Sequence, residues 1–206
     1  VLSDRYRRLD DYDLAEHVLP FLQRLRDARF ESVEPTQTKM YIHVGTPRGG
    51  GCTRIGDDNL IMNGAHIGHD VQVGSHTIIA SHVAIAGHAV VEDFAVIGGL
   101  SGVHQFVKVG AHVMAGVSSV VLQDIPPYVT VAGHPCAPHG INAEGLKRRG
   151  FTPEALSALK RAYRTLYKSG LTLADARAEL ARQAQEAPEV QAIVDFLATS
   201  TRGIVR

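Results

Sequence analysis

A six-residue repeat runs through the middle of the chain and limits its possible folds more than any other feature. Counting in steps of six from Ile55 to Val121, every position except Ala115 holds isoleucine or valine. The positions are Ile55, Ile61, Ile67, Val73, Ile79, Ile85, Val91, Ile97, Val103, Val109, Ala115 and Val121. A period of six matches neither the 3.6 residues of a helical turn nor the alternation of an ordinary strand. It is typical of a hexapeptide β-solenoid, in which three hexapeptides close one coil.

The residue types inside each hexapeptide fit such a coil. The β-branched residue packs inward, and glycine or alanine usually follows it, as at Gly56, Gly68 and Gly98. We expect these small residues at the bends between strands, where a side chain would hinder the turn. Residues 55–126 therefore predict four coils of 18 residues, with equivalent positions of neighbouring coils roughly 4.8 Å apart.

The repeat divides the chain into four parts. Residues 1–40 form an atypical N-terminal segment, in which a helix is possible over 12–29, and residues 41–126 form the β-helix. Residues 127–150 are a linker that also carries candidate binding residues, and residues 151–206 are a helical domain. The fold class is thus mainly β with a helical C-terminus.

Local signals mark the end of the solenoid and the start of the helices. Pro126-Pro127 lacks two backbone N–H groups, so we expect the strand ladder to end there and helical structure to follow. Thr152-Pro153 has the form of a helix N-cap followed by a proline in the first turn, and Thr172 can cap a second helix running to about Gln185. Pro188 begins a third helix. These helices would cap the solenoid or pack beside it.

Composition excludes several classes of protein. The 21 Lys and Arg residues balance the 21 Asp and Glu residues, which gives no reason to expect nucleic acid as a partner. Cys52 and Cys136 lie far apart without a C-x-x-C spacing, so we expect a reducing, cytoplasmic location. No stretch approaches the roughly 20 apolar residues of a membrane span.

Chemistry is expected at the segment from Asn63 to Asp70, which contains His66 and His69. Residues 18 apart occupy equivalent places in neighbouring coils, so His88 should lie next to Asp70, and Gly87 next to His69. A carboxylate beside a histidine sets its tautomer, which suits a general base. Gly87 would leave open space and an accessible backbone N–H beside His69, where an oxyanion could be held.

Two simpler interpretations compete with this one. Most of the other histidines, including His76, His82 and His112, are expected to be surface residues without a role. Three histidines across a coil interface could instead bind zinc. The 18-residue spacing places His88 against an aspartate and not against a histidine, so no metal is expected. A zinc enzyme of the carbonic-anhydrase type remains the alternative, as does a catalytically silent trimeric scaffold.

Longer motifs resemble a known family. They are His66-Ile-Gly-His-Asp70, Ile85-Ala-Gly-His88, Gly98-Gly-Leu-Ser-Gly-Val-His-Gln-Phe106, Val109-Gly-Ala-His-Val-Met114, Asp124-Ile-Pro-Pro-Tyr128, Gly145-Leu-Lys-Arg-Arg-Gly-Phe151 and Ser200-Thr-Arg-Gly-Ile-Val-Arg206. From about Tyr41 to the C-terminus, the chain closely resembles the acyl-carrier-protein-dependent UDP-N-acetylglucosamine 3-O-acyltransferases of lipid A biosynthesis. The resemblance implies a left-handed parallel β-helix. Members of that family begin with further coils, where this chain has its charged N-terminal segment.

The resemblance also implies an activity and a set of site residues. A 3-hydroxyacyl group would pass from acyl carrier protein to the 3-hydroxyl of UDP-N-acetylglucosamine, the first step of lipid A biosynthesis, without a cofactor. His69 would be the general base, Asp70 its support and Gly87 the oxyanion donor. Further substrate-binding residues would be His66, His88, His104, Gln105, Asn142, Glu144 and Arg148. The densest basic cluster, Lys147-Arg148-Arg149, independently suits a diphosphate.

Family membership further implies a homotrimer with active sites between neighbouring solenoids. The acyl chain would lie in the groove between subunits, where Met114 and Val117 would measure its length. A glycine at the position of Val117 accompanies a long chain in the family, so valine here predicts a shorter acyl group.

Overall fold

The computed structural model describes residues 29–30, 44–45 and 52–206 and divides the chain into two units, Val1–Cys52 and Thr53–Arg206. In the first unit, β1 (Arg29–Phe30) pairs antiparallel with β2 (Val44–Gly45). The helix predicted over 12–29 lies outside the described residues except at Arg29, which belongs to β1. The start of the β-helix at residue 41 stays a prediction.

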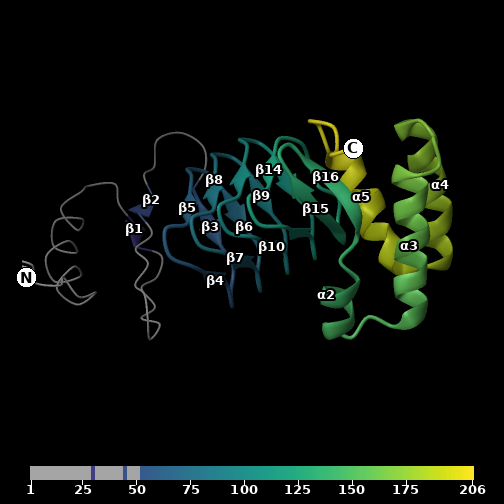
Figure 1. Ribbon diagram of the computed structural model, residues 1–206, viewed down its shortest axis with the longest axis horizontal. Helices are drawn as coiled ribbons and strands as arrows, with labels where there is room; N and C mark the ends of the chain where they lie inside the picture. The colour runs from purple at the N-terminus through teal and green to yellow at the C-terminus, as the bar shows by residue number, and fades with distance from the viewer. Residues whose placement is uncertain (1–28, 31–43, 46–51) are drawn as a thin grey trace, which may run out of the picture. The chain divides into compact units, whose positions relative to one another are not determined.

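The second unit begins with twelve two-residue strands that wind into four coils (Figure 1). The strands are β3 (Arg54–Ile55), β4 (Leu60–Ile61), β5 (His66–Ile67), β6 (Gln72–Val73), β7 (Ile78–Ile79), β8 (Ala84–Ile85), β9 (Val90–Val91), β10 (Val96–Ile97), β11 (Gly102–Val103), β12 (Lys108–Val109), β13 (Met114–Ala115) and β14 (Val120–Val121). Every third strand joins the same parallel sheet, with partners such as Val73 and Val91 18 residues apart. The predicted period and coil number are confirmed.

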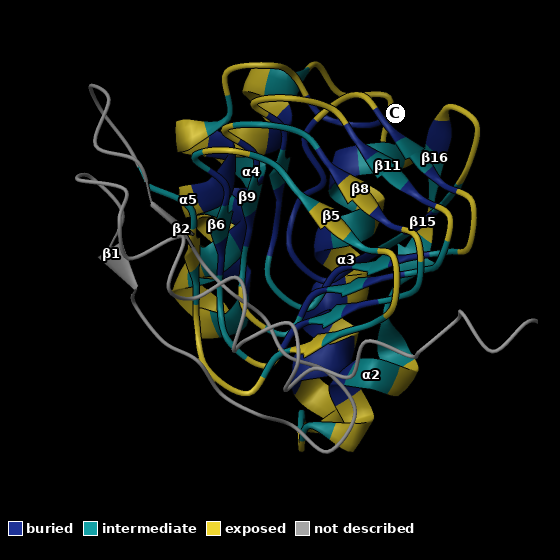
Figure 2. Ribbon diagram, turned by 90° about the vertical axis from the view of Figure 1, so that its left-hand side faces the viewer, coloured by how far each residue is buried: buried dark blue, intermediate teal, exposed yellow. Residues whose placement is uncertain are grey.

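The repeat residues form a continuous core inside the coils. Val91 and Val109 are 1% and 0% exposed, whereas Ile55, in the first coil, is only partly buried. Figure 2 shows buried residues recurring along the coils among intermediate and exposed ones. Each coil thus covers the apolar side chains of its neighbour, and burial of these side chains stabilises the stack.

The small residues serve a different purpose from the one expected. Except at Gly64, the bends are made by residues other than glycine in the left-handed region, including Asp70, His88 and Phe106 with φ of 59°, 60° and 64°. The glycines lie before the bend, where the coils approach each other closely: a Cβ on Gly98 would lie 2.6 Å from the backbone nitrogen of Val117. Glycine therefore permits coil stacking, while aspartate and histidine, which tolerate positive φ, occupy the bends.

The expectation that Pro126-Pro127 would end the strand ladder is wrong. β15 (Val129–Gly133) continues the sheet parallel to β13, and β16 (Cys136–Ile141) closes it in antiparallel orientation. The prolines lie between Ile125, which accepts a hydrogen bond from Gly110 N, and Tyr128, which donates one to Ala111 O. No ladder N–H is needed between these two residues, so the prolines interrupt nothing.

The helices that follow lie at one end of the coils (Figure 1). They are α2 (Ala143–Arg148), α3 (Pro153–Tyr167), α4 (Leu173–Glu186), the 3₁₀ turn η1 (Pro188–Val190) and α5 (Gln191–Thr199). The predicted N-caps are confirmed, since Thr152 Oγ1 accepts from Ala155 N and Thr172 Oγ1 from Asp175 N. Within the described residues, no helix is long and apolar enough to cross a membrane.

The last residues of the chain return to the solenoid. Asp124, 2% exposed, accepts hydrogen bonds at its carboxylate from Lys108 N and Ser200 Oγ, at 2.8 and 2.7 Å. Its backbone pairs with Gly203 and Val205. A buried carboxylate needs such donors to offset its loss of hydration, so this contact joins the helical domain firmly to the coils.

Candidate active site

His69 and Asp70 form a pair on an outer corner of the coil. The His69 side chain is 74% exposed, and its Nδ1 lies 2.8 Å from Asp70 Oδ2. The left-handed conformation of Asp70 directs the carboxylate back toward the preceding residue. An Nδ1–H donor to the carboxylate would leave Nε2 as the free basic nitrogen.

His88 lies beside Asp70 in the next coil, as the 18-residue spacing predicts. Its Nε2 is 3.7 Å from Asp70 Oδ2, and its backbone N–H donates to His69 O at 3.0 Å. The rings of His69 and His88 meet edge to face with centroids 4.9 Å apart. The carboxylate of Asp70 is therefore shared between two imidazoles.

Phe106 supports His88 from the third coil and was not among the predicted site residues. Its ring stacks on the His88 imidazole with centroids 4.8 Å apart and planes 6° apart. The Phe106 side chain is 52% exposed. It therefore acts through its contact with His88 and not as part of the buried core. Phe106 follows His88 by 18 residues, as His88 follows Asp70. Extending the 18-residue spacing by one more coil would have predicted this contact.

Gly87 lies directly against His69, but not in open space as expected. A Cβ at Gly87 would lie 2.5 Å from His69 Nε2, so the imidazole itself occupies this side of the glycine. At another corner of the coils, equivalent N–H groups are used: Asp57 N donates to Ser75 Oγ and Ser75 N to Asp93 Oδ1. Among the described residues, none accepts a hydrogen bond from Gly87 N–H. An unpaired donor thus lies beside the basic nitrogen.

The predicted residues of the substrate site gather at this same corner. His66 lies on β5 in the first of three successive coils, and Gln105 stands one 18-residue step beyond Gly87. His104 is exposed, and its Nδ1 lies 3.1 Å from the backbone oxygen of Gln105. The structure therefore brings His66, His69, Asp70, Gly87, His88, His104 and Gln105 to one edge of the solenoid.

The three residues predicted to bind the nucleotide lie near a different corner. Asn142 caps α2, because its Oδ1 accepts from Gly145 N and its Nδ2 donates to His112 O. Glu144 pairs with Lys147 at 2.8 Å, which lowers the pKa of its carboxyl group. Arg148 is exposed, and its side chain makes no hydrogen bond or ion pair with the described residues. Of the three side chains, that of Asn142 is already hydrogen-bonded to the backbone at both its oxygen and its nitrogen.

The basic cluster predicted in α2 is divided by the fold. Arg149 turns back onto the solenoid, where its Nη2 donates to Phe94 O at 3.0 Å and its guanidinium lies 5.3 Å from the centre of the Phe94 ring. Lys147 is held by Glu144. The fold thus turns Arg149 away from Lys147 and Arg148, which are both exposed, and binding of a diphosphate by the cluster stays a prediction.

His112 is not the surface residue that was expected. Its ring lies between Phe94 and Tyr128, with centroid distances of 4.8 and 5.5 Å. Burial, reinforced by the positive charge of Arg149, lowers the pKa of His112 to about 4. The neutral ring is therefore a structural element of the corner against which α2 packs.

The two residues expected to measure the acyl chain lie near each other in sequence but differ in exposure. Met114 points outward from β13 and is partly buried. Val117 follows this strand and is 69% exposed. A side chain so exposed in a single chain is free to line a groove formed with another subunit.

Among the described residues, a candidate metal-ligand group lies at the corner already described. Within the described part of the chain, His69, Asp70 and His88 have ligand atoms within 4.8 Å of one another. The 2.8 Å separation of His69 Nδ1 and Asp70 Oδ2 is that of a hydrogen bond. Both imidazoles already face the carboxylate, so the geometry needs no ion to explain it.

A stack of hexapeptide coils with a histidine–aspartate pair at an outer corner defines the class of hexapeptide-repeat transferases. Residues 52–87 match the family described as bacterial transferase hexapeptide. Residues 124–205 match the second domain of UDP-N-acetylglucosamine O-acyltransferase. Over these residues the chain is similar to the UDP-N-acetylglucosamine O-acyltransferase family.

Similar proteins agree in both sequence and structure. The chain is 59% identical over 164 residues to the acyl-[acyl-carrier-protein]–UDP-N-acetylglucosamine O-acyltransferase of Thiobacillus denitrificans, covering 80% of this chain and 64% of that protein. The UDP-N-acetylglucosamine acyltransferase structure of Francisella novicida matches with a TM-score of 0.77 and 41% identity, over 80% of this chain and 60% of that one. The UDP-N-acetylglucosamine O-acyltransferase structure of Moraxella catarrhalis matches with a TM-score of 0.76 and 40% identity, over 79% of this chain and 63% of that one.

These similarities confirm the predicted fold class, a left-handed parallel β-helix of hexapeptide repeats followed by a small helical domain. The chain spans 64% of the length of the Thiobacillus denitrificans protein.

Proposed function

We propose that this chain transfers a 3-hydroxyacyl group from acyl carrier protein to the 3-hydroxyl of UDP-N-acetylglucosamine in the cytoplasm. The observation that carries the proposal is the corner where His69, Asp70 and the unpaired Gly87 N–H lie together. The names of the relatives supply the substrates. Incubation with both substrates should yield the 3-O-acylated nucleotide sugar and free carrier-protein thiol. Absence of turnover would favour the silent scaffold, and stoichiometric zinc in the purified protein would favour the zinc enzyme.

The corner supports a direct transfer without a covalent enzyme intermediate. Asp70 holds the Nδ1–H of His69, so Nε2 takes the proton of the sugar hydroxyl as its oxygen attacks the thioester carbonyl. The resulting oxyanion accepts the Gly87 N–H. When the tetrahedral intermediate collapses, the C–S bond breaks, and the sulfur leaves as a thiol with the proton carried by His69. The ester oxygen remains on the sugar.

We propose that His66, His88, His104 and Gln105 line the substrate site at this corner, and that Asn142, Glu144 and Arg148 contribute to binding the nucleotide. Asn142 would act mainly by fixing the start of α2, because its side chain is occupied by Gly145 and His112. Arg148, exposed in the last turn of α2, offers a guanidinium fork for the diphosphate.

We propose a homotrimer in which neighbouring subunits share each site. The His69 corner and the corner that carries α2 are different edges of one triangular solenoid, because Asn142 contacts His112 and Arg149 contacts Phe94. One chain does not bring Arg148 to His69. A neighbouring subunit would join the two edges, and the exposed Val117 would then lie in the groove between them.

Phe106→Ala is expected to lower kcat about tenfold with little change in KM. The stacked Phe106 ring fixes His88, which in turn restrains Asp70 and thereby the orientation of His69. Steady-state kinetics should show this split, and Phe106→Tyr should restore the rate because it keeps the ring. Leu100→Ala, another exposed apolar residue with positive φ, is the matched control. Equal losses in both alanine variants would contradict a positioning role.

Val117→Gly is expected to shift the acyl-length preference toward longer chains. Removing the exposed valine side chain lengthens the apolar groove, and each additional methylene that becomes buried contributes about 0.8 kcal/mol, or about fourfold in kcat/KM. Carrier proteins loaded with 3-hydroxyacyl groups of graded length measure the profile. An unchanged optimum in the variant would remove Val117 from the ruler.

A further inference from the structure

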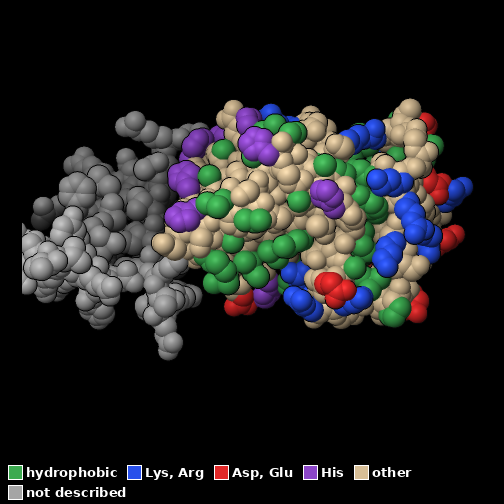
Figure 3. Space-filling model, in the orientation of Figure 1, with side chains coloured by type: hydrophobic (Ala, Val, Ile, Leu, Met, Phe, Trp, Pro, Cys, Tyr) green, Lys and Arg blue, Asp and Glu red, His purple; other side chains and the backbone are tan. Residues whose placement is uncertain are grey.

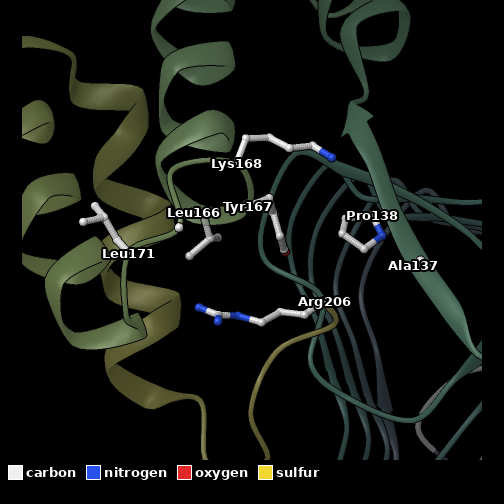
Figure 4. A pocket seen from close by; sticks show the side chains of 8 residues that line it. Ala137, Pro138, Leu166, Tyr167, Lys168, Leu171 and Arg206 are labelled. Atoms are coloured by element: carbon white, nitrogen blue, oxygen red, sulfur yellow. The ribbon is translucent and has the colours of Figure 1, made fainter.

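A pocket outside the His69 corner lies between the end of α3 and strand β16. Its volume is about 340 Å³, at the lower end of the roughly 300–1,000 Å³ usual for ligand pockets. Figure 4 shows its lining side chains, contributed by β16, by the end of α3 with the residues that follow it, and by the last residue of the chain. The pocket is open to solvent, and its size suits a small molecule.

One part of this pocket is apolar. Ala137 and Pro138 of β16 form one wall, and Leu166 and Leu171 line the helical side. Leu171 remains 38% exposed although it is a large hydrophobic residue. Exposed leucine in a concave site gains free energy when a hydrocarbon group covers it.

Two basic side chains line the rest of the pocket. Lys168 and Arg206 line it, and no lining residue has an acidic side chain. Neither side chain makes an ion pair or hydrogen bond with the described residues. A second pocket, at the start of α3, differs in this respect because Arg161 shares it with Glu154 and Glu186. The charge of the β16 pocket therefore favours an anion.

Tyr167 adds an unused hydrogen-bond donor. Its hydroxyl oxygen is buried and has no partner among the described residues. Burial raises the pKa of the phenol, so the group stays protonated and can donate. In Figure 4 the ring projects between Lys168 and Arg206. A buried hydroxyl without a partner is costly, and a ligand oxygen would remove this cost.

We propose that this pocket binds a small carboxylate with a medium-length hydrocarbon chain. The carboxylate would accept the Tyr167 hydroxyl and pair with Lys168 and Arg206, while the chain would cover Leu166 and Leu171. Carboxylates accept several charge-assisted hydrogen bonds at once. The pocket is distinct from the proposed acyl-transfer corner, so this binding does not depend on the enzyme's activity.

Isothermal titration calorimetry of the full chain with octanoate tests the proposal. We expect saturable binding that weakens about tenfold or more in Tyr167→Phe, which removes only the hydroxyl, and in Arg206→Ala. Arg161→Ala, in the second pocket, should leave the affinity unchanged. Thermal melts verify that each variant is folded, and Lys168→Ala serves as a further variant if either is not.

Two additional ligands separate the alternatives. Butanoate should bind more weakly than octanoate, because it covers less apolar surface, and inorganic phosphate should bind weakly as well. Equal binding of phosphate and octanoate would overturn the proposal in favour of a general anion site. Absence of octanoate binding, or equal binding by wild type and Tyr167→Phe, would also overturn it.

Discussion

His69→Ala is expected to reduce acyl transfer by about 10²- to 10⁴-fold, the usual contribution of a positioned general base. The side chain is 74% exposed and its hydrogen bond is to the neighbouring Asp70, so the variant should fold normally. Rates of 3-O-acyl product formation at saturating substrate measure the loss, and circular dichroism with thermal melting measures the fold. His66→Ala, also on this corner but without the Asp70 contact, should lose less.

Mixing two inactive variants would show whether neighbouring subunits share the site. His69→Ala removes the base, and Arg148→Ala removes a guanidinium from the other edge of the solenoid. Co-refolded mixtures should regain part of the activity, since some sites combine an intact His69 from one chain with an intact Arg148 from its neighbour. A rate for His69→Ala equal to wild type would exclude His69 as the base. Mixtures as inactive as their components would contradict a shared site.

Gly87→Ala is expected to cost about 10²-fold or more in kcat while leaving stability almost unchanged. The added Cβ would lie 2.5 Å from His69 Nε2 and 2.7 Å from its Cε1, and it would displace the imidazole from the Gly87 N–H. An exposed ring can rotate away at little cost to folding, but a displacement of about 1 Å at the reacting group is costly for catalysis. Steady-state kinetics measure the loss of kcat, and thermal melting of the same preparation measures whether stability is unchanged.

Gly98→Ala is the matched control because its new Cβ would meet backbone in place of a side chain. The backbone nitrogen of Val117 would be 2.6 Å away and the carbonyl carbon of Gly116 2.7 Å away. Adjacent coils would have to separate, and overpacking of this kind destabilises by about 1–3 kcal/mol. If Gly87→Ala melts as low as Gly98→Ala, its loss of activity reflects misfolding and the proposed contact with His69 is wrong.

The solenoid part of the fold was predictable because its contacts follow the sequence at a constant interval. Val73 pairs with Val91 and Gln72 with Val90, all at a spacing of 18. The same interval correctly placed His88 beside Asp70 and Gly87 beside His69. The helix starts at Thr152 and Thr172 were also predictable from the sequence, because an N-cap is a local hydrogen bond.

Contacts outside that interval were not predictable. Arg149 reaches Phe94, 55 residues earlier, and this contact separates it from Arg148. His112 has the same corner conformation as His76, yet Tyr128 and Phe151 lie against its ring. Similarly, the hairpin of β15 and β16 follows two prolines that suggested a break. In each case the partner is a distant segment that no local pattern specifies.

The sequence by itself determined the coil, its 18-residue register, the position of His69, Asp70, Gly87 and His88 at one corner, and resemblance to a transferase family. A regular stack converts separation in sequence into separation in space. Only the tertiary structure decided the role of the small residues, the division of the basic cluster, the support of His88 by Phe106, and the pocket around Tyr167. These features depend on side-chain packing between elements, which is set by the shape of both surfaces and not by the period of either.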